Sequence, residues 1–332
     1  FRARPDSMTN EQSDLLPGDE PPAPPLRLLR LGGVASGMVA LLAVGLFVIP
    51  FLGALIAPMG LIPVLHFQAG GGEGFRAWGP AVALLLAAAA VGAAGLALPL
   101  LAAYALLIVL PAVSVEGWVR WGSSEGRWVA LTTLGAVLAT LVTVSVLALP
   151  MGPVEAVSVW LRAAAADATE LYAAWGIAEG EMELALDAAE RMASWVLPSL
   201  PVAYLVVVLF WIRPRLRMLG LPLEVGPFEE YRNDEWLPAL FAAAGIGTLA
   251  LGGTARWAAL NILIAVIILF FIQGLAIIRA HLARWVGRGR LVRWGVALLC
   301  LQMPLPLVVA VLGVADSFHS LRPRSNDDGG TQ

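Results

Sequence analysis

The stretch WAALNILIAVIILFFIQGLAII, residues 257–278, contains no charged side chain and decides the fold class of this chain. A transmembrane helix needs about 20 mostly apolar residues, because the hydrocarbon core is roughly 30 Å thick and each helical residue rises 1.5 Å. This stretch is long enough to cross a membrane once. Uncharged stretches of similar length follow the same pattern, and we predict one span in each: 128–154, 192–212, 236–255 and 294–315.

Two longer stretches, 31–75 and 77–115, exceed the length of one span; the first contains a single charged residue, Glu73, and the second contains none. Pro50 and Pro99 lie inside them, and proline removes a helical hydrogen bond. We therefore predict two hairpins, 33–49 with 51–65 and 80–97 with 99–114. The prediction is an all-α polytopic transmembrane bundle of about nine spans. Eight or seven remain alternatives, since a short hairpin half can be re-entrant.

The composition agrees with a membrane protein. Hydrophobic residues make up 59% of the 332 residues and charged residues only 14%, whereas soluble domains carry about 25% charged residues. All 21 basic residues are Arg, and the formal net charge of -3 leaves no basic footprint for nucleic acid. The single cysteine, Cys300, excludes an intrachain disulfide and a cysteine-based metal cluster. We expect no cofactor and no metal.

Arginine asymmetry predicts the orientation in the lipid bilayer. Arg213, Arg215 and Arg217 follow one span, and five arginines fall within residues 279–293 between two others. The positive-inside rule places both loops in the cytoplasm. Counting spans then places the N-terminus inside and the C-terminus outside. We expect a multi-pass protein of a bacterial cytoplasmic (inner) membrane.

Tryptophans mark the ends of the predicted spans. Ten of the 12 lie at or beside such an end, which is typical of the aromatic belts at a membrane interface. These ten are Trp78, Trp118, Trp121, Trp128, Trp195, Trp211, Trp236, Trp257, Trp285 and Trp294.

The chain divides into five segments. Residues 1–26 are proline-rich and predicted to be a disordered tail, and 27–150 hold the two hairpins and one span. Residues 151–191 form an external acidic amphipathic segment, 192–318 hold four spans, and 319–332 form a second disordered tail.

The acidic segment has eight acids against Arg162 and Arg191. Pro153 suits the first turn of a helix, and Asp187 and Arg191 are spaced for an ion pair on a second helix. The segment is either a lid that attracts cations or the solvated face of an interfacial helix. Charge runs favour the second interpretation.

Four polar residues of the last third are candidate ligand-binding groups: Asn261, Gln273, Gln302 and Asp316. Amides within a bundle either bind a polar ligand or form hydrogen bonds between helices, and the second role is the commoner one. Polar groups at membrane depth are otherwise rare.

Two further patterns concern packing and cavities. Pro304 and Pro306 leave backbone carbonyl groups beside Gln302 without their helical hydrogen bonds. At membrane depth such groups are tolerated only where protein or a water-filled cavity covers them. We therefore predict a cavity near Gln302. Small residues at helical spacing predict a helix-packing face: Gly33 with Gly37 and Ser36 with Ala40.

The sequence has no catalytic signature. His66, His281 and His319 are far apart, and the metalloprotease, phosphate-loop and nucleophile-elbow motifs are missing. The run GGGEG at residues 70–74 lacks the lysine of a phosphate loop. We expect a protein that is not an enzyme.

Several short motifs carry a family resemblance: EWLP at 235–238, NIL at 261–263, FFIQGLA at 270–276 and LGVAD at 312–316, with Arg322 just beyond. Over residues 234–324 the chain resembles the YybS-like family of predicted polytopic membrane proteins, DUF2232. That family is distantly similar to the substrate-binding subunits of energy-coupling-factor transporters. The resemblance implies a small ligand, with a partner membrane protein or a separate ATPase. The extra spans and the acidic segment depart from those subunits.

The favoured function is therefore small-solute binding related to transport. The alternative is a structural or regulatory membrane protein that acts through protein partners without a ligand. A polar cavity near Asn261, Gln273 and Gln302 favours the first, and a dry, well-packed bundle there favours the second.

Overall fold

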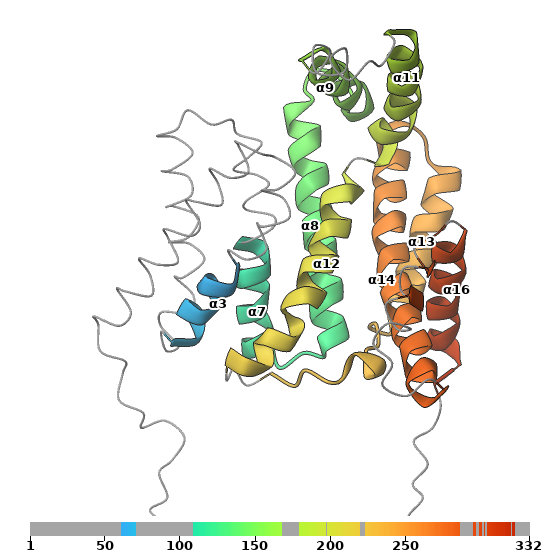
Figure 1. Ribbon diagram of the computed structural model, residues 1–332. Coiled ribbons are helices and arrows are strands. Elements are labelled where there is room, and N and C mark those ends of the chain that lie inside the picture. The colour runs from blue at the N-terminus through green and yellow to red at the C-terminus, as the bar shows by residue number, and fades with distance from the viewer. Residues whose placement is uncertain are drawn as a thin grey trace, which may run out of the picture.

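All regular structure in the described part of the chain is helical, and that part contains no β-strand. Figure 1 shows long helices that lie side by side and run along a common direction. The all-α prediction is therefore confirmed for these residues. The computed structural model describes residues 61–70, 109–167, 179–196, 198–219 and 223–285, and near the C-terminus 295–296, 299–300, 302, 304–319 and 321–322.

The first predicted hairpins fall mostly outside the described residues. Of this region the structure describes helix α3 (Leu61–Gly70) and helix α7 (Leu110–Trp121). α7 continues past the predicted end of its span, and Arg120 of its last turn binds Glu116 at 2.8 Å. The packing residues predicted in 33–40 also lie outside the described part.

Three described helices are long and apolar enough to cross a membrane. They are α8 (Glu125–Leu147), α12 (Ser199–Leu216, extended by the 3-10 turn η3, Arg217–Leu219) and α14 (Gly253–Trp285). They coincide with three of the predicted spans. The total of about nine stays a prediction.

The start of α8 shows why the chain forms a helix there. The Ser124 hydroxyl accepts a hydrogen bond from the Arg127 amide, as an N-cap residue does, and Glu125 adds a negative charge to the first turn. The preceding turn contains Gly122 at φ 57°, a left-handed conformation that favours glycine. This turn makes α7 and α8 neighbours.

The interfacial prediction for the tryptophans is wrong for Trp118, Trp128 and Trp257, which are at most 4% exposed. Trp118 stacks on Trp128 with ring centroids 4.5 Å apart. The Trp257 indole donates a hydrogen bond to the Ser194 carbonyl at 3.2 Å. These rings hold helices together, because a buried indole combines a large apolar surface with one hydrogen-bond donor.

One end of the bundle gathers charged residues. Arg213 of α12 binds Glu125 of α8, and Arg279 of α14 binds Glu229 of the 3-10 turn η4 (Phe228–Glu230). We call this the arginine end, and the end where Trp257 meets Ser194 the opposite end. Helix α13 (Leu237–Ala250) leads from the arginine end to the opposite end, where a short turn connects it to α14.

The last helix, α16 (Leu305–Phe318), differs from the predicted final span. Its 14 residues extend about 21 Å, less than the hydrocarbon thickness. Just beyond it, Arg322 donates to the Glu229 carbonyl at 3.0 Å. At Arg322 the chain therefore lies at the arginine end, and the predicted direction of the final span, away from Arg213, is wrong for α16. An uncharged stretch shows where a chain is apolar but not in which direction its helix runs.

α14 and α16 approach each other closely at two glycines. A methyl group added to Gly313 would lie 2.0 Å from the Phe270 carbonyl oxygen, and one added to Gly274 would lie 2.0 Å from the Val309 carbonyl oxygen. Small residues allow such backbone contact between membrane helices. Among the described residues, Gly274 and Gly313 therefore set the close approach of α14 and α16.

The acidic segment forms helices α9 (Pro153–Asp167) and α11 (Glu179–Val196), which pack on each other at the opposite end (Figure 1). α9 begins at Pro153 as predicted. The Asp187 carboxylate does not pair with Arg191, whose Nε donates instead to the Asp187 backbone carbonyl at 3.2 Å. This carboxylate lies 3.3 Å from Arg162 of α9, which also binds Glu190 at 2.5 Å. The charges therefore join the two helices.

Candidate functional site

The connection between η3 and α13 is fixed to the ends of three helices. Arg213 is only 7% exposed, and its Nη2 donates to the carbonyl oxygens of Gly226 (2.7 Å) and Pro227 (3.3 Å). The same guanidinium binds both carboxylate oxygens of Glu125. A planar guanidinium can satisfy several acceptors at once, so one side chain joins α8, α12 and the connection.

The next part of the connection lies against the first turn of α8. A methyl group added to Gly126 would lie 1.9 Å from the Arg232 carbonyl oxygen, so only glycine allows this contact. Arg127 Nε donates to Asp234 Oδ2 at 2.6 Å. These contacts place residues 232–235 beside α14.

A buried polar network joins this connection to α14 and α16. Gln273 of α14 donates from Nε2 to Asp316 Oδ2 at 2.8 Å, and its Oε1 accepts from the Asn233 amide at 3.2 Å. The Asn233 side chain donates to the Leu269 carbonyl at 3.0 Å and accepts from the Tyr231 hydroxyl at 2.8 Å. Gln273 thus links two helices and the connection.

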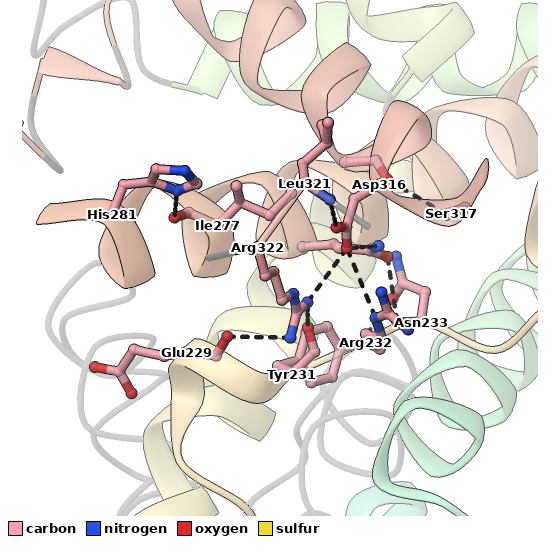
Figure 2. A network of polar contacts seen from close by, with 12 residues as sticks. Glu229, Tyr231, Arg232, Asn233, Ile277, His281, Asp316, Ser317, Leu321 and Arg322 are labelled. Carbon is pink, nitrogen blue, oxygen red and sulfur yellow. Dashed lines mark hydrogen bonds and ion pairs between the residues drawn. The ribbon is translucent and has the colours of Figure 1, made fainter. Parts of the chain in front are cut away.

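Asp316 is the centre of the network, with a side chain that is fully buried. Figure 2 shows Arg232, Leu321 and Arg322 converging on it. The Leu321 amide donates to Oδ1 at 3.0 Å, while Arg322 Nη2 and Arg232 Nε lie 3.4 and 3.9 Å from Oδ2. Two arginines therefore offset the cost of burying this carboxylate.

A cavity of about 620 Å³ borders the network and lies within the size range of small-molecule sites. Arg127 is occupied by Asp234, whereas Arg232 makes no side-chain hydrogen bond with the described residues and is 54% exposed. Its guanidinium is therefore available to a ligand. The charged and amide side chains of the lining are Arg127, Arg232, Asn233, Asp234, Glu235, Gln273 and Asp316.

The local charges lower the pKa of two carboxyl groups in the connection. Partial burial acts to raise the pKa of Asp234, but hydrogen bonds from Arg127, the Glu235 amide and Trp236 hold it below its usual value. Partial burial also acts to raise the pKa of Glu229. Hydrogen bonds from its own backbone amide and from Arg279 outweigh this effect, so the pKa of Glu229 is lowered. Both groups remain charged at neutral pH.

Asn261 lies elsewhere, 12 residues before Gln273 on α14 and therefore about 18 Å from it along the helix. It is fully buried. Its Nδ2 donates to the carbonyls of Trp195 and Trp257, each at 2.9 Å, and its Oδ1 accepts from the Ser199 hydroxyl at 2.6 Å. This amide ties α11, α12 and α14 together at the opposite end.

The structure brings Gln273 and Asp316 together but not the other two candidates. Gln302 is exposed and does not line the cavity, and its backbone N–H donates to the Leu299 carbonyl at 3.0 Å. The cavity beside Pro304 and Pro306 stays a prediction, and the cavity of about 620 Å³ lies at the arginine end.

The sequence reasoning missed Tyr231, Arg232 and Asn233, as well as the role of Arg322. These residues lie outside the apolar stretches, where polar side chains are expected to contact water. The available signal was the unusual density of polar residues in EEYRNDE, residues 229–235.

Comparison with known proteins gives one result. Residues 38–317 match a family described as predicted membrane protein, DUF2232. None of the curated proteins and none of the solved structures matches the chain.

Proposed function

Because the chain belongs to the DUF2232 family of predicted membrane proteins, we propose that it is a multi-pass membrane protein that binds a small polar solute in the cavity beside Asp316. The observation that carries the proposal is the exposed Arg232 guanidinium, which borders a cavity of about 620 Å³ with a buried carboxylate on its wall. Pockets of this size with a few convergent polar groups commonly hold small ligands.

The charges of the cavity favour a zwitterionic solute. Arg232 offers several N–H donors in a plane, the geometry that suits a carboxylate. The lining has three acidic residues (Asp234, Glu235 and Asp316) and two arginines, so its net charge is negative by one. This net charge favours an ammonium group at the other end of the solute. A free amino acid has both groups at this scale.

The proposal is binding and not catalysis, and it places the protein in a bacterial cytoplasmic membrane with the arginine end and N-terminus inside. Arg213, Arg217 and Arg279 at one end support this orientation. Movement of the solute would require an ion gradient or a partner membrane protein with a separate ATPase. The resemblance to energy-coupling-factor subunits inferred from the sequence motifs would imply such a partner.

The test measures ligand-induced stabilisation of the full chain in uncharged detergent. Free amino acids, diamines and dicarboxylates are added in turn, and the thermal unfolding midpoint is recorded. We expect amino acids to raise the midpoint most, because a bound ligand stabilises the folded state by mass action. Arg232→Gln should abolish the increase, whereas Arg120→Gln, an exposed arginine already paired with Glu116, should keep it.

The proposal is refuted if no class raises the midpoint or if Arg232→Gln responds as the unsubstituted protein does. A second candidate is a structural or regulatory protein that acts through protein partners. The complete pairing of the Asn261 amide supports it, since this group serves helix packing alone. Co-purification of a stoichiometric partner without any ligand response would favour that function.

A further inference from the structure

A second cavity, of about 460 Å³, lies on the other side of the connection and is basic. Three arginines line it: Arg213 and Arg217 after the apolar part of α12, and Arg279 after the apolar part of α14. Phe210 and Phe228 supply apolar walls. We propose that this cavity binds the phosphate headgroup of an anionic phospholipid. The proposal is independent of the solute cavity.

The charge balance of the second cavity fits one phosphodiester. Arg213 is neutralised by Glu125, and Arg279 by Glu229 at 2.6 Å. Arg217 has no acidic partner among the described residues and donates to the Gly226 carbonyl. Three arginines and two glutamates leave one positive charge, equal and opposite to that of a phosphodiester headgroup.

Donors remain for the phosphate oxygens. Arg279 uses only its Nε for Glu229, and its Nη1 and Nη2 make no hydrogen bond with the described residues. The Arg279 guanidinium carbon lies 5.5 Å from the Phe228 ring centre, and that of Arg213 lies 5.8 Å from it. Cation–π attraction to this ring adds to the ion pairs that hold both guanidinium groups in place.

The position of the cavity favours a lipid over a free anion. α12 has no charged residue from Ser199 to Ile212, and α14 has none from Trp257 to Ile278. The cavity lies where both apolar stretches end, the level at which headgroups meet spanning helices. Basic pockets between membrane helices on the cytoplasmic side are known to hold anionic headgroups.

The experiment adds phosphatidylglycerol, phosphatidylcholine or inorganic phosphate to the full chain in uncharged detergent. Native mass spectrometry counts bound lipid, and thermal unfolding reports stabilisation. We expect one phosphatidylglycerol per chain and a raised midpoint with that lipid alone. Arg217→Gln should weaken its binding about fivefold, and Arg217→Gln with Arg279→Gln should remove it.

Arg120→Gln removes the same charge from an exposed site at the same end and should leave lipid binding unchanged. Arg217 is exposed and makes a single backbone hydrogen bond, so its substitution should leave the fold intact even if the double variant unfolds. Equal binding of phosphatidylcholine, unchanged binding by Arg217→Gln, or equal stabilisation by inorganic phosphate would each overturn the assignment.

Discussion

Substitution of Gly313 by alanine tests the contact between α14 and α16. The added methyl group would lie 2.0 Å from the Phe270 carbonyl oxygen, whereas ordinary contact begins at 3.4 Å. The helices must therefore separate by about 1.4 Å. Overpacking of this kind costs about 1–3 kcal/mol.

The displacement also affects the buried network. Gln273 Nε2 and Asp316 Oδ2 are 2.8 Å apart, and a separation larger by about 1.4 Å would break this hydrogen bond. Loss of a hydrogen bond to a charged group costs about 1.5–3 kcal/mol, and alanine recovers about 1 kcal/mol of helix propensity. We expect a net loss of about 1.5–5 kcal/mol in the free energy of unfolding.

The assay is thermal unfolding of the purified chain in uncharged detergent, monitored by tryptophan fluorescence. Gly135→Ala is the matched control, because a methyl group there meets no atom within 4 Å on α8. The control should be unchanged or slightly more stable. If Gly313→Ala and Gly135→Ala unfold at the same temperature, the close contact between α14 and α16 is refuted.

Three other predictions follow from the polar contacts. Asn261→Leu should lower the unfolding midpoint without changing ligand or lipid binding, because it leaves the Ser199 hydroxyl without its 2.6 Å acceptor; unchanged stability would contradict the structural role. Asp234→Asn should lower the midpoint at pH 7, and the difference from the unsubstituted protein should shrink below about pH 4. The pKa of Asp234 is lowered in the folded state, so its ion pair with Arg127 stabilises the fold above the usual Asp pKa, and this stabilisation is lost as the pH falls through the folded-state pKa. A difference that grows in acid would contradict this. A cytoplasm-specific reporter fused after Arg322 should match one fused after Leu219 in activity, and opposite results would place the two points on different sides of the membrane.

The positions of the long spans were predictable from the sequence. Hydrocarbon excludes unpaired charge and unpaired backbone groups, so the uncharged stretches that form most of α8, α12 and α14 could be recognised as spanning helices. The helix start at Pro153 was also readable, because it depends on local backbone chemistry. Burial of Gln273 and Asn261 followed from the cost of an unpaired amide in lipid.

The site itself was only partly predictable. Gln273 and Asp316 were selected for their depth, yet their partners come from residues 229–235 and Arg322, which look like ordinary solvated sequence. Their burial depends on Gly126 and Arg213 holding the connection in place. Such long-range contacts have no periodic signal, and the direction of α16 likewise depends on its contacts with α14.

The close fit of α16 against α14 has a consequence for biosynthesis. A ribosome delivers α14 well before residues 305–318, and 14 residues are too short to be inserted as an independent span. α16 therefore takes its position by docking on a surface that the earlier helices have already made. A nascent chain that stops before Leu305 exposes the Gly274 surface and leaves Gln273 Nε2 without its Asp316 acceptor.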